Sequence, residues 1–331
     1  MKSLVNHTGT KNSPDAANGY ASGTAVACWV EHMRCGNFEA AWRISDATRR
    51  TDVPFDPRLP RHFRSVWRGT SLQGRRVLIR CNRGLGDSIQ FIRYAPLVKA
   101  VAAEVIVSAQ PELIPLLETM PAIDRIVPYD GEPKPYDVDL EVMELPYALR
   151  TKEGTIPADV PYLHVPKSTL PAENRFAVGI VWASGDWDRR RSIPLPQLAP
   201  LTNVGGIKLF AFQRGATLGP AGHLSIHNLN WRDIMHEAAL MRALDLLISV
   251  DTMPAHLAGA LGVPVWLLLH GDADWRWMKD RDDSPWYPTM RLFRQHHQGS
   301  WQPVLERVAA ALRALSSARR GANSGNTESI S

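Results

Sequence analysis

The stretch that decides the fold is VLIRCNRGLGDSIQ, residues 77–90, in which an apolar run is followed by a glycine-rich turn and a helical pattern. The run 77–79 predicts a buried strand, and Gly84 and Gly86 predict a tight turn before the next helix. Asp87 opens that predicted helix. Such turns usually bind phosphate, and an acid there would repel a phosphate group unless it has another task.

Two interpretations of Asp87 stand side by side. As an N-cap, its carboxylate would accept hydrogen bonds from the free amides of the first helical turn. As a general base, it would accept a proton from a hydroxyl held nearby. The turn is not a dinucleotide G-x-G-x-x-G motif, because Ile89 stands at the third glycine position, and it lacks the Gly-Lys-Ser/Thr ending of a P-loop. Hydride transfer and ATPase chemistry therefore lose support.

Outward from this stretch, apolar strand patterns alternate with helical ones, which predicts parallel sheets covered by helices. The predicted strands have little internal alternation, as in doubly wound sheets buried on both faces. A proline-rich passage near residues 157–171 separates the two series, and a second α/β domain should begin near residue 174. The predicted strands are 75–81, 104–109 and 123–129 before that passage, and 176–184, 207–212, 224–229, 245–250 and 263–269 after it.

Composition narrows the class of protein. The chain has 331 residues, enough for two domains, and 44% of them are hydrophobic, as in globular proteins. A net charge of +5 without a long Lys/Arg tract gives no reason to expect nucleic acid. The three cysteines form no CxxC pair, and we find neither a secretory signal nor a membrane-spanning run. We therefore expect a cytoplasmic protein without a transmembrane segment; peripheral contact with a membrane surface stays open.

The domain organisation follows from these patterns. Polar residues at both ends predict disorder over 1–22 and 317–331. The apolar spacing between about 24 and 50 suits two short helices broken near Gly36, a helical hairpin. We expect the hairpin and a linker over 23–70, a first Rossmann-like domain over 71–170, and a second one with a C-terminal helix over 171–316.

A second constellation is ISVDTMPAHLAGALGVPVW, residues 248–266. Here a strand should end at Val250 and a helix should start at Asp251 or Thr252, which leaves free backbone amides for an anion. The Thr252 hydroxyl and the His256 imidazole could add hydrogen bonds to a phosphate or sugar. For His256 the plainer interpretation is a core histidine with a backbone partner.

Two further loops follow strands. In WASGDWDRRRSIPL, residues 182–195, the arginines could neutralise a pyrophosphate without a metal, although a solvated loop is the plainer interpretation. In residues 270–288, four large aromatics lie among charges, and we favour packing between domains over sugar stacking. The acids of that loop match no calcium spacing, so we predict no metal.

Five motifs follow one another along the chain: GLGDSIQFIRYAPL, GIVWA, RRRSIPL, DLLISVDTMPAHLAGALGVPVW and DWRW...RDDSPWYP. Together, in this order, they resemble glycosyltransferase family 9, the ADP-heptose:lipopolysaccharide heptosyltransferase family. The resemblance covers roughly residues 35–315 and is closest to the module of bacterial tetratricopeptide-repeat proteins, of whose repeats the hairpin would be a remnant. It implies a GT-B-like α/β fold, two Rossmann-like doubly wound domains facing across a cleft. It also implies inverting, metal-independent transfer from a nucleotide sugar to a glycan or lipid-linked acceptor such as lipopolysaccharide.

The resemblance also implies roles for individual residues. Asp87 matches the catalytic aspartate, and Asp251, Thr252 and His256 match the donor motif. The family usually has a lysine where Arg191 stands. A non-catalytic scaffold or nucleotide-sugar sensor with the same fold is the alternative. The expected site comprises catalytic Asp87; donor-binding Arg189, Arg191, Ser192, Gln213, Asp251, Thr252 and His256; acceptor or turn residues Gly84, Gly86 and Gln90; and neither metal nor cofactor.

Overall fold

The computed structural model describes residues 22–50, 67, 69–131, 135–185, 188–215, 224–296 and 299–325. Most of the segment 1–22 that was expected to be disordered lies outside these residues, as does the chain from 326 onward.

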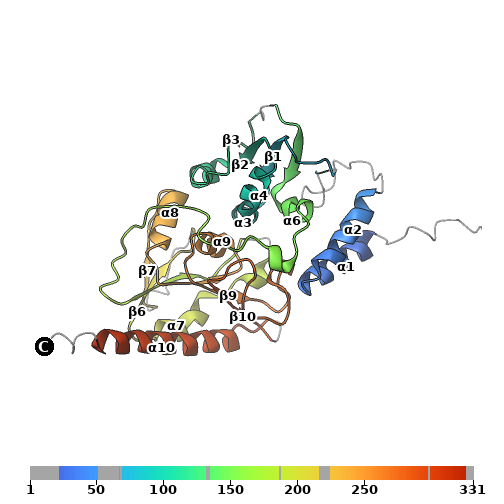
Figure 1. Cartoon of the computed structure of the whole chain (residues 1–331). Coiled ribbons are helices and arrows are strands. Elements are labelled where there is room, and N and C mark those ends of the chain that lie inside the picture. Colours follow the sequence, from blue (N-terminus) through green and yellow to red (C-terminus); the bar gives the residue numbers. More distant parts are fainter. Residues whose placement is uncertain are drawn as a thin grey trace, which may run out of the picture.

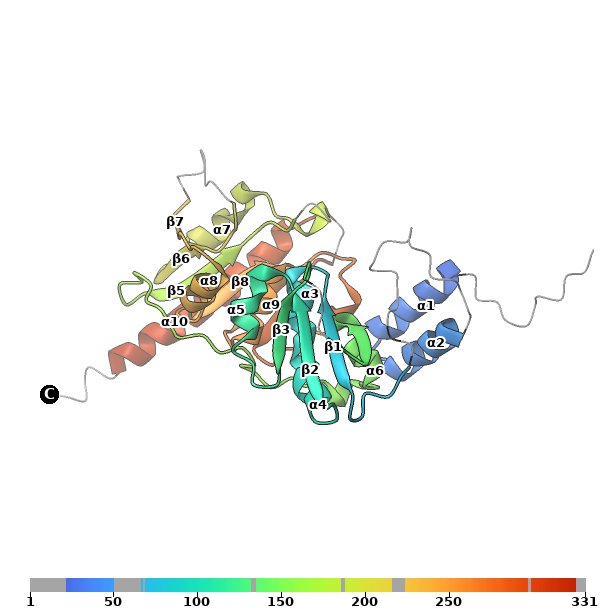
Figure 2. The same cartoon turned by 90° about the horizontal axis from the view of Figure 1, so that it is seen from above.

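The first domain is built on a parallel sheet of four strands in the order β3-β2-β1-β4. Short helices follow the strands and cover the sheet (Figure 2). β4 was not expected, because its short sequence VDLE alternates acids with apolar residues. The strands are β1 (Arg76–Cys81), β2 (Glu104–Ala109), β3 (Arg125–Pro128) and β4 (Val138–Glu141), and the main helices are α3 (Leu85–Phe91), η2 (Ile92–Tyr94), α4 (Ala95–Lys99), α5 (Ile114–Leu117) and α6 (Leu145–Ala148).

The second domain is built on a parallel sheet of six strands in the order β10-β9-β8-β5-β6-β7. If β5 is counted as the first strand and β10 as the sixth, the sheet read from the β7 edge has the strand order 3-2-1-4-5-6. This is the strand order of a Rossmann fold. β10 was also not expected. The strands are β5 (Phe176–Val181), β6 (Ile207–Ala211), β7 (Ile226–Asn228), β8 (Leu246–Val250), β9 (Val265–Leu269) and β10 (Met290–Arg294), and the main helices are α7 (Ala199–Thr202), α8 (Ile234–Met241), α9 (Met253–Ala260) and α10 (Gln302–Gly325).

Both sheets confirm the expected α/β fold of two Rossmann-like domains. β1, β2, β5, β6 and β8 are buried along almost their whole length, which explains their continuous apolar sequences. The domains meet where α3 packs on α9 (Figure 1). At this junction the buried Arg93 donates to Gln90 O in its own domain and to Trp286 O in the other.

The expected helical hairpin is present as α1 (Ser22–Arg34) and α2 (Phe38–Arg50), and it lies beside α6 in both views (Figures 1 and 2). It contacts both domains. The Trp42 indole donates to Thr151 O at 2.7 Å in the first domain, and Arg34 pairs with Asp272 at 2.6 Å in the second. Phe38 and Trp42 belong to the same buried apolar cluster as residues of both domains. The hairpin is therefore part of the folded core.

The expectation of disorder from residue 317 is wrong for the part that the structure describes, because α10 continues to Gly325. Alanine and arginine between 309 and 320 favour helix, and two contacts anchor this region. Ser316 donates to Gly205 O at 2.8 Å, and Arg319 pairs with Asp245 at 2.7 Å.

Candidate functional site

The strand orders mark two candidate ligand positions, one in each domain. In an open parallel sheet, ligands bind at the carboxyl ends of the strands where the order reverses. The order reverses between β1 and β4 in the first sheet and between β5 and β8 in the second. Segment 82–87 follows β1, and segments 182–192 and 251–256 follow β5 and β8. Most of the predicted site residues therefore lie at these two reversal points.

Asp87 is the third residue of α3, because Gly84 is the N-cap and the helix begins at Leu85. The N-cap interpretation of Asp87 is therefore wrong: the helix starts earlier, at the glycine. Asp87 Oδ1 accepts a hydrogen bond of 2.8 Å from Nη1 of Arg276, a residue of the second domain. Of the two side chains, 23% of Asp87 and 10% of Arg276 is exposed. The carboxylate thus faces the other domain.

Gly86 and Gln90 line the same side of α3. A Cβ at Gly86 would lie 2.9 Å from Cδ2 of His256 and 3.4 Å from Cα of Met253, so glycine permits the approach of α3 to α9. Gln90 is fully buried, and neither its amide nitrogen nor its amide oxygen has a hydrogen-bond partner among the described residues. A buried amide without partners is costly, and such groups are frequent where a ligand or water binds.

The N-terminus of α9 points to the reversal point of the second sheet. Thr252 is the N-cap in extended conformation, and its side chain makes no capping hydrogen bond. Pro254 lies in the first turn, as expected. Asp251 is buried, and burial raises the pKa of its carboxyl, an effect that Arg276 and Arg191 oppose.

His256 is packed tightly one turn into α9. Its Nδ1 lies 3.1 Å from the Tyr287 hydroxyl, its ring stacks on Trp277 at 5.4 Å, and its Nε2 lies 3.9 Å from Asp251 Oδ1. Burial and neighbouring arginines lower the pKa of this histidine well below its ordinary value, so the imidazole is neutral at pH 7. The histidine is buried as the plainer interpretation expected, but its partners are side chains at the site.

The three arginines of the loop after β5 form the short helix η6 (Arg189–Arg191). Among them, Arg191 reaches the reversal point of the second sheet, where its Nη1 donates to Asp251 O at 3.0 Å. Arg190 turns back to Asp188 and has 62% of its side chain exposed, as in a solvated loop. Arg189 is also exposed. The hydroxyl of Ser192 accepts from Ser184 N at 3.0 Å and holds the loop closed.

Gln213 lies two residues after β6 and supports the loop that starts at residue 182. Its side-chain oxygen accepts from Trp182 N at 3.2 Å and from Ala183 N at 2.8 Å. Next to it, Arg214 donates to Glu237 in its own domain and to Glu112 in the first domain. The structure therefore gives Gln213 a supporting position, and its contact with a donor stays a prediction.

Arg276 was not expected as a site residue. It lies in the short turn η9 (Trp275–Trp277) after β9 and has 8% of its surface exposed. Its Nε lies 3.1 Å from Asp274 Oδ1. Burial would lower the pKa of Arg276, but Asp274, Asp87 and Asp251 outweigh it and raise the pKa, so the guanidinium stays charged. The only sequence signal was an arginine between two tryptophans in a loop that follows a strand.

The aromatic residues of the same loop close the junction between domains, as favoured from the sequence. Trp275 contacts Trp29 of the hairpin at 5.4 Å, Phe91 of α3 at 6.1 Å and Trp286 at 6.2 Å. With Trp277 stacked on His256, the loop is fixed to both domains.

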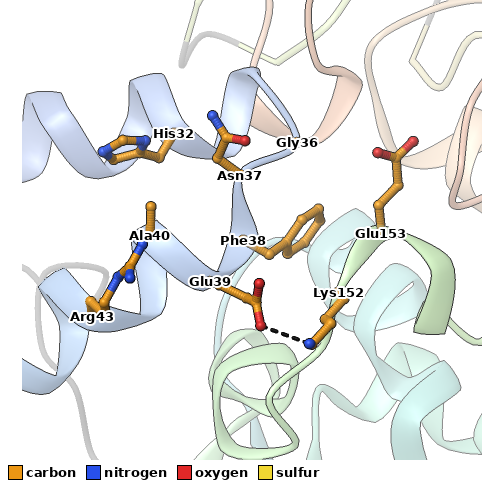
Figure 3. Close-up of a pocket in the computed structure, with 9 residues that line it drawn as sticks. All are labelled: His32, Gly36, Asn37, Phe38, Glu39, Ala40, Arg43, Lys152 and Glu153. Carbon is orange, nitrogen blue, oxygen red and sulfur yellow. Dashed lines mark ion pairs between the residues drawn. The ribbon is translucent and has the colours of Figure 1, made fainter.

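A cavity of about 370 Å³ lies away from this region, between the hairpin turn and residues 152–153 (Figure 3). Phe38 is one of the residues that line it, and Glu39 and Lys152, also in the lining, form an ion pair of 2.6 Å. Its lining carries both charges and includes none of the predicted site residues.

Within the described residues, no three histidine, cysteine, aspartate or glutamate side chains are grouped so that they could hold a metal ion. No helix in the same part of the chain is both long and apolar enough to span a membrane.

Comparison with known proteins identifies structures of similar fold. No family model matches the chain. Among curated proteins, it is 27% identical over 293 aligned residues to Protein FlbA of Caulobacter vibrioides, an alignment that covers 75% of this chain and 48% of FlbA. The chain thus spans about half the length of that relative.

Two solved structures have a similar fold. One is a glycosyl transferase family 9 protein of Veillonella parvula, with 13% identity and a TM-score of 0.52 over 68% of this chain and 87% of that one. The other is the ADP-heptose lipopolysaccharide heptosyltransferase II of E. coli, with 16% identity and a TM-score of 0.51 over 74% and 99%. The expected GT-B-like fold is therefore confirmed.

Proposed function

We propose that this protein is an inverting, metal-independent glycosyltransferase. It would move a sugar from a nucleoside diphosphate donor to a hydroxyl of a glycan or lipid-linked acceptor, for which lipopolysaccharide is the first candidate. Heptose is the first candidate sugar, because a solved structure of similar fold is named for ADP-heptose and lipopolysaccharide. The three cysteines Cys28, Cys35 and Cys81 are free thiols, which suits a reducing cytoplasm.

One observation carries the proposal: α3 and α9 bring the reversal points of both sheets together. Asp87 is in contact with the second domain through Arg276, and Gly86 lies against His256. Group transfer requires a base for the acceptor beside an anion site for the donor, and each domain supplies one of them.

The chemistry is a single displacement. Asp87 takes the proton of the acceptor hydroxyl, and the hydroxyl oxygen forms a bond to the anomeric carbon of the sugar. The bond from that carbon to the diphosphate oxygen breaks, and its electron pair leaves with the nucleoside diphosphate. Because the oxygen attacks opposite the leaving group, the configuration at the anomeric carbon inverts.

The second domain would stabilise the departing diphosphate. The first turn of α9 offers backbone amides, and the Thr252 side chain makes no capping hydrogen bond to them. Arg191, already beside Asp251, adds a fixed positive charge. Such preorganised donors act where charge develops, without a metal ion.

The second candidate is a non-catalytic scaffold or nucleotide-sugar sensor. It is favoured by the Asp87–Arg276 ion pair, which occupies one oxygen of the carboxylate that the reaction needs.

A thermal-shift screen of the full chain against ADP, UDP, GDP, CMP and their sugar conjugates tests the proposal first. A ligand at 100 times its dissociation constant stabilises a protein by about 2.7 kcal/mol. A rise in melting temperature with one nucleotide and its conjugate supports a donor site and selects the substrate for a transfer assay. Stabilisation followed by no transfer to any glycan favours the sensor, and no shift with any nucleotide contradicts the proposal.

A further inference from the structure

The two tryptophans around Arg276 fix it between the helix of the proposed base and the helix of the proposed donor site. Trp275 stacks on Phe91 of α3 with an angle of 23° between the rings, and Trp277 stacks on His256 of α9 with an angle of 22°. The residue between them can therefore reach both helices.

The guanidinium of Arg276 is buried, but not all of its N–H groups donate a hydrogen bond. It donates to Asp87 at 2.8 Å and lies beside Asp274, but its Nε makes no hydrogen bond. Arginine cannot give up its charge, and its forked donors match phosphate oxygens in pairs. A diphosphate at the N-terminus of α9 would thus compete with Asp87 for the same cation.

We propose that Arg276 is a positioning residue that exchanges partners during the reaction: it holds Asp87 in the donor-free protein and moves to the diphosphate when the donor binds. This inference rests on the proposed function. The exchange frees Oδ1 of Asp87 for the acceptor hydroxyl only after the donor is in place. It therefore sets the order of binding, donor before acceptor.

The exchange predicts opposite effects of two substitutions on the binding of nucleoside diphosphate. Isothermal titration calorimetry with ADP, UDP and GDP, each beside its monophosphate, measures them. Arg276→Gln should weaken binding of the preferred diphosphate about 10- to 100-fold, because it loses a charge-assisted hydrogen bond, and should affect the monophosphate less. Asp87→Asn should strengthen diphosphate binding about 3- to 10-fold, because a neutral amide oxygen competes less well than a carboxylate for the Arg276 guanidinium.

The double variant separates exchange from simple repulsion between Asp87 and the phosphates. If Asp87 acts through Arg276, adding Asp87→Asn to Arg276→Gln changes the affinity less than twofold. If Asp87→Asn strengthens binding by the same factor in both backgrounds, the effect is direct repulsion and the exchange is overturned.

A matched ion pair provides the control. Arg76 and Asp137 lie 2.8 Å apart with 43% and 31% of their side chains exposed, and they lie at the amino ends of β1 and β4, opposite the carboxyl ends where a ligand is expected. Arg76→Gln and Asp137→Asn should leave diphosphate binding unchanged. Should Arg276→Gln fail to fold, Arg276→Lys retains the charge, loses the fork, and should weaken binding about 3- to 10-fold.

Unchanged diphosphate affinity in the Arg276 variants, with normal binding by the unsubstituted protein, overturns the exchange and leaves the proposed function standing. If the unsubstituted protein binds no nucleotide, the proposed function fails, and the exchange fails with it.

Discussion

Gly86 of α3 and His256 of α9 are in direct contact across the junction of the two domains, close enough that a Cβ at Gly86 would lie 2.9 Å from the imidazole Cδ2. The ring of His256 cannot retreat, because it stacks on Trp277 and bonds to Tyr287. Because glycine has no side chain, residue 86 allows α3 of the first domain to pack closely against α9 of the second.

Gly86→Ala should lower the free energy of unfolding by about 1–3 kcal/mol, the usual cost of forcing an extra methyl group into a packed site. The intrinsic preference of alanine for helix opposes this by up to about 1 kcal/mol, so the packing cost dominates. Urea denaturation measures the change. Gly154→Ala is the control, because nothing lies within 4 Å of its Cβ position, and an equal effect there would contradict the contact.

Trp42→Ala should destabilise the whole chain by about 3–5 kcal/mol, since this side chain is 5% exposed and its indole bonds to Thr151 O. We expect one cooperative transition at a lower temperature by calorimetry. Tyr129→Ala removes an aromatic ring that is 53% exposed and should have little effect. Loss of the hairpin alone, with an unchanged main transition, would show that the hairpin is not part of the core.

The stability of the protein should fall as the pH drops below about 6.5, the ordinary pKa of histidine. Burial lowers the pKa of His256 in the folded state, so below that pH the unfolded chain binds a proton that the folded chain does not. Each such proton contributes up to about 1.4 kcal/mol per pH unit. His256→Asn should reduce this slope, measured by urea denaturation between pH 5 and 7.5, whereas substitution of the exposed His164 should not.

Removal of divalent metals should leave sugar transfer unchanged, because the proposed leaving-group site uses backbone amides, Thr252 and Arg191. An assay with EDTA beside one with added Mg²⁺ measures this. A rate that falls with EDTA and recovers with Mg²⁺ would contradict the metal-independent mechanism.

Much of the fold could be predicted from local pattern. β1, β2, β5, β6 and β8 are buried on both faces, so their apolar runs are visible in the sequence. β4 and β10 could not be predicted in this way, because short strands with charged residues resemble loops. The rule that ligands bind after parallel strands was enough to select Asp87 and segment 251–256.

The partners of these residues could not be predicted. Arg276 lies 189 positions from Asp87 in the sequence, and only the packing of the two domains brings them together. Within the second domain, the fold of the loop after β5 decides that Arg191 faces Asp251 while Arg190 turns to Asp188 at the surface. The sequence predicts that α3 starts at Asp87, but Gly84 is the N-cap and the helix begins at Leu85, two residues before Asp87.

The most direct test of the central claim is the rate of sugar transfer by Asp87→Asn, measured with the sugar nucleotide that stabilises the protein. Asparagine keeps the size of the side chain and an oxygen for Arg276 but cannot take a proton. The account predicts a rate about 10²- to 10⁴-fold lower with donor binding retained, while Asp137→Asn transfers normally. Transfer by Asp87→Asn at the rate of the unsubstituted protein would contradict the account.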